Sequence, residues 1–218
     1  MRFEEARELL ATVPDRLPPM PEALGVTALG MADGGPPRFP RFSENAGRAA
    51  AVLILIFPDA DGEARLVLTQ RSPGEHRHAG QISLPGGAID DDDESIEAAA
   101  LREAYEEVGL DPKAADVEIV GVLPMVDVRV SGFLVHPVIA FAPREPSLTA
   151  DGYEVAAVFT APLAAFLPDA PVEQVIAERD GYRLRYGAYP IGEHQVWGAT
   201  GMLLGRLGAW LAGNRKGG

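Results

Sequence analysis

Short runs of apolar residues, some alternating with polar ones and some uninterrupted, recur along the chain at the length of β-strands. We predict strands at seven of these runs, residues 50–57, 64–69, 117–124, 133–141, 154–159, 175–178 and 182–186. Turn-forming Asp and Gly residues lie between the first two runs, at 59–62, and between the last two, at 179–181. Each of these two pairs of strands is therefore predicted to form a hairpin.

Apolar residues spaced three or four positions apart indicate helices at four places, 3–12, 94–108, 163–167 and 198–212. Residues 13–47 are rich in Pro and Gly and predict an irregular arm. Strands interspersed with few helices are typical of the α/β or α+β class. We predict three segments, an N-terminal helix and arm at 1–47, a main domain at 48–212 and a C-terminal tail at 213–218.

The predicted helix at 94–108 carries an acidic face. A step of about 100° per residue places Glu103, Glu106 and Glu107 within one arc, beside the small residues Ala99 and Ala100, which leave room for a ligand. Apolar residues fall on the opposite side, namely Leu101, Ala104, Tyr105 and Val108. Three neighbouring carboxylates repel one another without a cation, and their hard oxygens suit Mg²⁺, Mn²⁺ or Ca²⁺. The face predicts a divalent-metal site for chemistry on a phosphate ester or anhydride, whereas the plainer interpretation is a solvated acidic surface.

The stretch from Gly87 to Leu110 resembles the Nudix hydrolase signature, G-x5-E-x7-R-E-U-x-E-E-x-G-U, in which U is a bulky aliphatic residue. The fixed places are filled by Gly87, Glu94, Arg102, Glu103, Glu106, Glu107, Gly109 and Leu110. Two departures are visible, because six residues separate Gly87 from Glu94 and because Ala104 is smaller than the usual residue. The extra residue lies in an acidic loop, where length is tolerated.

A second motif, from Leu66 to Gly87, resembles the additional signature of the coenzyme A pyrophosphatase branch, which reads roughly L-L-T-x-R-S-x3-R-x3-G-x3-F-P-G-G. The matches are Leu68, Thr69, Arg71, Ser72, Gly80, Pro85, Gly86 and Gly87. His76 stands where the branch has arginine, and Leu84 stands where it has phenylalanine. The longer acidic loop and a His-x-x-Trp-Gly-x-Thr segment at 194–200 are also similar to this branch, and the resemblance spans about residues 45 to 212.

The resemblance implies the Nudix fold, a mixed β-sheet sandwiched between α-helices, and a Mg²⁺ or Mn²⁺ cofactor. It implies as metal ligands Glu103, Glu106, Glu107 and the carbonyl of Gly87. Arg102 is expected to orient a glutamate through an ion pair, and Glu94 is expected to pair with Arg102 or to join an outer shell. Catalytic roles are thus expected for Arg102, Glu103 and Glu106.

Hydrolysis also needs a general base. Family members use a glutamate of the signature or one from a distant loop, and Glu154, which follows the flexible stretch 147–153, is the candidate here. An ordinary carboxylate at a strand edge is the alternative for Glu154. Asp90 to Asp93 are expected to form a solvated loop rather than to bind metal.

Basic residues gather in the glycine-containing loop after the strand at 64–69. They are Arg71, His76, Arg77 and His78, in a chain whose formal net charge is −13. Coenzyme A carries a pyrophosphate and a 3′-phosphate, and the fork of an arginine matches phosphate oxygens. These four residues are the predicted substrate-binding set, and hydrolysis of coenzyme A would release 3′,5′-ADP and 4′-phosphopantetheine.

The composition limits what the chain can be. With 218 residues, 47% of them hydrophobic, it can form one compact domain, and without cysteine it has neither disulfides nor thiol catalysis. Its acidity argues against nucleic acid as a partner, because polyanions need a basic surface. The charged N-terminus is not a signal peptide, and the longest apolar run, 49–57, is too short to cross a bilayer. We expect a soluble, cytoplasmic monomer or homodimer with a small nucleotide-type substrate and no membrane partner.

Four other functions stay under comparison. A Nudix enzyme for NADH or ADP-ribose remains open because His76 and Leu84 depart from the branch signature. An isoprenoid diphosphate isomerase on the same fold commonly needs a cysteine near its site, and the chain has none. A non-catalytic nucleotide-binding module usually lacks signature glutamates, all of which are present here. A calcium loop starting at Asp59 would need glutamate at its twelfth place, where Gln70 stands.

Overall fold

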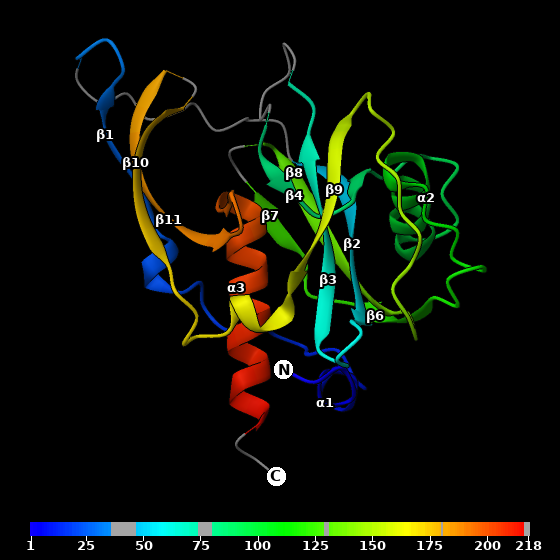
Figure 1. The fold of residues 1–218 in the computed structure, drawn as a ribbon. Helices are drawn as coiled ribbons and strands as arrows, with labels where there is room; N and C mark the ends of the chain where they lie inside the picture. Colours follow the sequence, from blue (N-terminus) through cyan, green and yellow to red (C-terminus); the bar gives the residue numbers. More distant parts are fainter. Residues whose placement is uncertain (36–46, 74–79, 129–130, 180, 216–218) are drawn as a thin grey trace.

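The computed structural model describes residues 1–35, 47–73, 80–128, 131–179 and 181–215. Within these ranges the strands form two sheets with helices around them (Figure 1). The main sheet contains eight strands, β2 (Arg48–Pro58), β3 (Ala64–Arg71), β4 (Ile82–Ser83), β5 (Gly86–Ala88), β6 (Glu118–Val122), β7 (Val126–Val128), β8 (Phe133–Phe141) and β9 (Val155–Pro162). The small sheet contains four, β1 (Val26–Met31), β10 (Glu173–Arg179), β11 (Tyr182–Ile191) and β12 (His194–Val196).

The main sheet is mixed and is buried on both faces. Its long central strands β2 and β8 run parallel, from Arg48 opposite Phe133 to Ile56 opposite Phe141, whereas the other strand pairs are antiparallel. Side chains of a strand alternate between faces. Leu53 and Leu55 accordingly pack on one side of β2, and Ile54 packs on the other.

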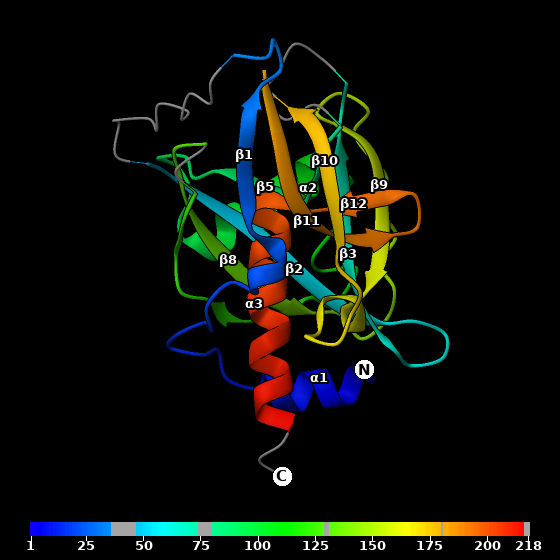
Figure 2. The ribbon, with the colours of Figure 1, turned by 90° about the vertical axis from the view of Figure 1, so that its left-hand side faces the viewer.

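Two helices cover the two faces of this sheet. Helix α2 (Ile96–Val108) packs on the face that carries Leu53, and α3 (Gly198–Asn214) packs on the face that carries Ile54. Figure 1 shows them on opposite sides of the sheet, with the small sheet beyond α3, and Figure 2 shows the small sheet in front. The predicted mixed sheet between helices is confirmed.

The interpretation of 13–47 as an irregular arm is wrong for residues 22–31. Glu22–Leu24 form a 3₁₀ helix, η1, with Leu24 buried, and β1 pairs with β11 through Val26 opposite Tyr186. Every residue of β1 is exposed or half-buried, so the sequence lacks the alternation that marks a half-buried strand. Its stability comes from backbone hydrogen bonds to a strand about 150 residues away in the chain.

The seven predicted strands are all confirmed, with shifts of a few residues at their ends. Helix α1 (Phe3–Leu9) is shorter than predicted, and the predicted helix at 163–167 is the 3₁₀ helix η2 (Leu163–Phe166). Four strands of two or three residues, β4, β5, β7 and β12, were not predicted because such short segments show no periodicity. Across the described ranges, no helix has both the length and the apolar character needed to span a membrane.

Candidate active site

The ends of α2 are set by its own residues. The Oγ of Ser95 accepts a hydrogen bond from the N–H of Ala98 at 3.1 Å, so the helix begins at Ile96 and not at residue 94. Gly109 has a left-handed backbone with φ of 67° and ends the helix, as predicted. The register of the acidic residues along α2 is therefore fixed from both ends.

Two glycines bring the β5 backbone against α2. Gly86 has a φ of 148°, and a Cβ there would lie 2.6 Å from the Cα of Val52 on the paired strand β2. A Cβ on Gly87 would lie 2.5 Å from Oε2 of Glu103. A side chain at Gly86 would clash with the β2 backbone, and one at Gly87 would have to displace the Glu103 carboxylate, so glycine lets β5 lie close to both. The structure thus places Gly87 and Glu103 together, as predicted.

Arg102 is the hub of the charged network on α2. Its Nε and Nη2 donate to the two carboxylate oxygens of Asp93, each at 2.9 Å, and Nη2 also donates to the carbonyl of Ala88 at 3.1 Å. Its Nη1 donates to Glu103 at 3.0 Å and to Glu106 at 3.2 Å. Hydrogen bonding to Arg102 lowers the pKa of Asp93 to about 2, and the bond from Asp93 raises the pKa of Arg102. Arg102 therefore holds two signature glutamates in place, as predicted.

The partner that anchors Arg102 is Asp93. Of the two roles expected for Glu94, pairing with Arg102 is wrong, and a place in an outer shell stays a prediction. The prediction of a solvated loop is confirmed for Asp90 to Asp92, which are exposed, and is wrong for Asp93, whose side chain is only 6% exposed. The N–H of Asp93 donates to the carbonyl of Asp90 at 3.1 Å, and Asp93 Oδ2 accepts from the N–H of Asp90 at 2.8 Å. This tight turn folds Asp93 back onto Arg102, whereas the Glu94 side chain is exposed just before the helix cap.

Glu107 is a buried carboxylate. It is 5% exposed and accepts a hydrogen bond from the N–H of Gly86 at 3.0 Å. Burial raises the pKa of Glu107 to about 7, and the charges of Glu103 and Glu154 add to the rise. The Gly86 N–H and the positive charge of Arg71 act in the opposite direction. The sequence placed Glu107 on an exposed acidic face and did not predict this burial.

Glu103 and Glu106 differ in exposure. Burial raises the pKa of the Glu103 carboxyl, the Arg102 guanidinium opposes this, and the charges of Glu106 and Glu154 raise it further. The Glu106 side chain is exposed on the same side of the helix. The neighbouring carboxylates thus disfavour the ionised form of Glu103, which is the electrostatic condition under which a bound cation is stabilising.

The remaining faces of α2 correct two further predictions. Ala99 and Ala100 are fully buried in the core between α2 and the sheet, so they leave no room for a ligand. Tyr105, predicted on the core side, is 62% exposed. Small side chains allow the helix to approach the sheet closely, and the large phenol is consequently left on the outer side.

Glu154 is held at the rim of the carboxylate cluster by an aspartate that the sequence analysis did not single out. The carboxylate of Asp151 accepts hydrogen bonds from the N–H groups of Tyr153, Glu154 and Val155 at 3.2, 3.0 and 2.8 Å. The N–H of Asp151 donates to the backbone carbonyl of Glu107 at 3.0 Å, which ties this turn to the end of α2. The Asp151-Gly152 pair is a typical turn signal and could have indicated it.

Arg71 reaches the same cluster from the sheet. It is the last residue of β3, it pairs with Val155 beside Glu154, and its charge lowers the pKa of Glu107. The structure therefore brings together Arg71, Glu107 and Glu154, which lie far apart in the sequence. The other three residues of the predicted substrate-binding set, His76, Arg77 and His78, lie outside the described residues.

The donor set fits a hard divalent cation. Glu103, Glu106 and Glu107 offer carboxylate oxygens beside the backbone of Gly87, and the pKa values of Glu103 and Glu107 are raised. In the part of the chain described by the structure, no three His, Asp or Glu side chains are already arranged around one point as a metal would require. Glu103 and Glu106 instead share the guanidinium of Arg102, which serves as their cation.

Comparison with known proteins agrees with this site. The family model described as NUDIX domain matches residues 47–176, more than half of the chain. A protein of Cronobacter sakazakii named "Uncharacterized Nudix hydrolase NudL" is 40% identical over 171 residues, which is 78% of this chain and 86% of the relative. A protein of the same name from Shigella boydii is 44% identical over 160 residues, 73% of this chain and 81% of the relative.

Among solved structures, RenU, a Nudix hydrolase from M. smegmatis, is matched over 63% of this chain and 80% of that one, with 27% identity and a TM-score of 0.46. The family model and the two NudL relatives both cover the segment that contains the α2 carboxylates. The chain therefore belongs to the Nudix hydrolase family, whose members act on pyrophosphate bonds.

Proposed function

We propose that this protein hydrolyses the pyrophosphate bond of coenzyme A, in its free, oxidised or acylated forms, to 3′,5′-ADP and 4′-phosphopantetheine. The observation that carries the proposal is that Arg71 lies within electrostatic reach of Glu107, whose pKa its charge lowers. Arg71 belongs to the 66–87 segment, which resembles the signature of the coenzyme A branch, whereas Glu107 belongs to the Nudix signature. The two motifs thus contribute to one site, where a phosphate could lie between a cation and the carboxylates.

Glu103, Glu106 and Glu107, with the carbonyl of Gly87, are the proposed ligands of Mg²⁺ or Mn²⁺. A divalent ion held there would neutralise phosphoryl charge and would make an attacking water easier to deprotonate. Arg102 is the proposed positioning residue, since its fork fixes the Glu103 and Glu106 carboxylates from one side and is itself anchored by Asp93. Because Arg102 donates to the carboxylates of Asp93, Glu103 and Glu106, its contribution is geometric and electrostatic rather than proton transfer.

Glu154 is the proposed general base. Its side chain is exposed at the rim, and its charge acts on both Glu103 and Glu107, so it lies within electrostatic reach of the reacting region. Its carboxylate would accept the proton of the water that attacks phosphorus, and the bridging P–O bond would break to release two phosphate monoesters. Asp151 supports this role by fixing the backbone from Tyr153 to Val155.

Substrate comparison tests the proposal. Purified protein is incubated with coenzyme A, NADH, ADP-ribose and a diadenosine polyphosphate, each with Mg²⁺, Mn²⁺ or EDTA, and products are identified by liquid chromatography and mass spectrometry. We expect the highest kcat/KM for coenzyme A, metal dependence, and 3′,5′-ADP with 4′-phosphopantetheine as products. A higher kcat/KM for NADH or ADP-ribose would overturn the coenzyme A assignment and leave the metal-dependent hydrolysis in place.

A further inference from the structure

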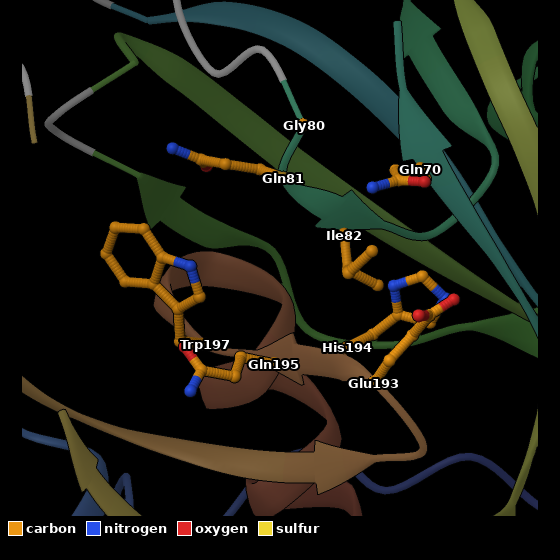
Figure 3. A pocket seen from close by; sticks show the side chains of 8 residues that line it. All are labelled: Gln70, Gly80, Gln81, Ile82, Glu193, His194, Gln195 and Trp197. Carbon is orange, nitrogen blue, oxygen red and sulfur yellow. The ribbon is translucent and has the colours of Figure 1, made fainter. Parts of the chain in front are cut away.

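A cavity of about 340 Å³ lies on the face of the main sheet opposite to α2. One wall comes from Gln70 at the end of β3 and from Gln81 and Ile82 at β4, and the other comes from β12 and the start of α3 (Figure 3). Gln70 alternates in step with Leu66 and Leu68, which pack on the α3 side of the sheet. The volume is at the lower end of the range for ligand pockets.

Two aromatic rings border this cavity, and each of them stacks on a second aromatic ring of the protein. The indole of Trp197 stacks on the ring of Tyr186, with centroids 4.2 Å apart and an interplanar angle of 24°. The imidazole of His194 stacks on Phe159 at 4.3 Å and 20°. Rings fixed in this way are ready-made platforms, because a ligand that stacks on them does not have to order them first. Such platforms suit a flat group.

The polar groups of the cavity are mainly amides. Gln70 and Gln81 lie on one side of it and Gln195 lies on the other, with the rings of Trp197 and His194 (Figure 3). Glutamine offers both donors and an acceptor, and can pair with the edge of a purine base. The described lining contains neither Lys nor Arg, and Glu193 adds a carboxylate. The described lining therefore suits a flat, hydrogen-bonding group.

The cavity and the carboxylate site are neighbours. Gln70 and Arg71 are consecutive, and consecutive side chains of a strand point to opposite faces. Gln70 borders the cavity, whereas the charge of Arg71 acts on Glu107. The pairing of β3 with β9 is irregular between these two residues, a feature that re-aims side chains next to active sites. A ribose alone separates a base from its pyrophosphate, so sites for the two must be close.

We propose that this cavity binds the adenine base of the substrate, stacked on Trp197 and hydrogen-bonded by Gln70 and Gln195. The proposal rests on the proposed function in taking the substrate to be an adenine nucleotide. The proposal assigns recognition of the base to the α3 side of the main sheet, at the end of β3. The pantetheine arm of coenzyme A, which is also uncharged, is the rival occupant that an experiment must distinguish.

Fluorescence of Trp197 tests this directly. Trp210 is the only other tryptophan, so a Trp210→Phe variant reports on Trp197 alone. The variant is titrated in EDTA with adenosine, with pantetheine and with inorganic phosphate. We expect saturable quenching by adenosine and none by phosphate. An unchanged signal with adenosine up to its solubility limit, or quenching by pantetheine at lower concentration, would overturn the proposal.

Amide variants on the same background sharpen the test. Gln70→Leu keeps the size of the side chain and removes its hydrogen bonds, and we expect adenosine to bind about three- to tenfold more weakly. Gln195→Leu is a second variant in case the first does not fold. Gln174→Leu is the matched control, because its amide on β10 donates to the carbonyl of Ala23 away from the cavity. Equal weakening in Gln70→Leu and Gln174→Leu would contradict the proposal.

These titrations contain no metal and involve no hydrolysis, so they separate two possible failures. Adenosine binding without hydrolysis of coenzyme A would support the base site and overturn the proposed function. Hydrolysis of coenzyme A without quenching of Trp197 by adenosine would overturn the base site and leave the proposed function standing.

Discussion

The end of β3 separates two regions of opposite chemistry. On the α2 side, Arg71 and Arg102 lie among carboxylates, and burial and like charges raise the pKa of Glu107 to about 7. On the α3 side, the described residues that line the cavity bring amides, aromatic rings and the carboxylate of Glu193. A one-residue step along a strand thus changes the environment from highly charged to mainly neutral.

This difference suggests that catalysis and substrate binding are assigned to opposite faces at the same end of the sheet. Interactions with the developing charge of a reacting phosphate affect the rate of the chemical step, whereas a site for an unreactive group affects binding of ground and transition states alike. The charged side is expected to govern kcat, and the neutral side is expected to govern KM. The following predictions break or sharpen this division, from the largest effect to the smallest.

Glu106→Gln should have the largest effect. The side chain is exposed, so the fold is preserved, while a proposed metal ligand is lost. Because metal-based charge stabilisation is worth several kcal/mol, kcat for coenzyme A should fall by about a hundredfold or more. Steady-state kinetics with Mg²⁺ measures it, beside Glu97→Gln on the same helix as the control. A loss confined to KM would contradict the assignment.

Arg102→Lys should reduce activity by about ten- to a hundredfold, the range seen when groups that orient metal ligands are changed. Lysine keeps the charge but lacks the fork that binds both oxygens of Asp93 while reaching Glu103. The readout is the Mn²⁺ concentration for half-maximal activity, which should rise. Full activity with unchanged Mn²⁺ dependence would show that Arg102 acts only as a positive charge.

Glu107 should make the metal-free protein less stable as the pH rises. Its folded pKa of about 7 lies above the ordinary value of 4.5, so its contribution is fully present below pH 4.5 and is lost as the pH rises through 7. Between pH 4.5 and 8, wild type should lose about 3 kcal/mol relative to Glu107→Gln. Urea unfolding in EDTA measures the difference, and parallel pH dependences of the two proteins would contradict it.

Asp93→Asn should have the smallest effect, and with the opposite pH dependence. Hydrogen bonds from Arg102 lower the pKa of Asp93 to about 2, so its stabilisation is present above pH 4 and is lost as the pH falls to 2. The melting temperature of wild type should exceed that of the variant at neutral pH, and the two should converge near pH 2. Asp90→Asn, at a more exposed position 3.6 Å from Arg102, is the control.

Local signals made much of the fold predictable from the sequence. Helix α2 combines helical periodicity with a cap at Ser95 and a stop at Gly109, and the buried strands β2 and β3 flank a turn of Asp and Gly residues. Strand β1 could not be predicted, because its residues show no buried face and its partner β11 lies about 150 positions away. The pairing of a strand with a distant segment cannot be seen in the local pattern of apolar and polar residues.

The sequence was sufficient to identify the signature residues of the candidate site, but not their burial or the residues that hold them in place. The signature identified Glu103, Glu106 and Arg102 because their spacing is fixed by one helix. The burial of Glu107 depends on Gly86 of β5, and the role of Asp93 depends on a turn whose shape the spacing does not give. The cavity beside Trp197 joins described residues of β3, β4, β12 and the start of α3, so no single motif indicates it.

The kcat and KM of two variants on the same substrate test the division of labour most directly. Gln70→Leu and Glu106→Gln are compared with wild type, with coenzyme A and saturating Mg²⁺. The account predicts that Gln70→Leu raises KM by about three- to tenfold with kcat unchanged, whereas Glu106→Gln lowers kcat by about a hundredfold or more. A fall in kcat of similar size in both variants would contradict it.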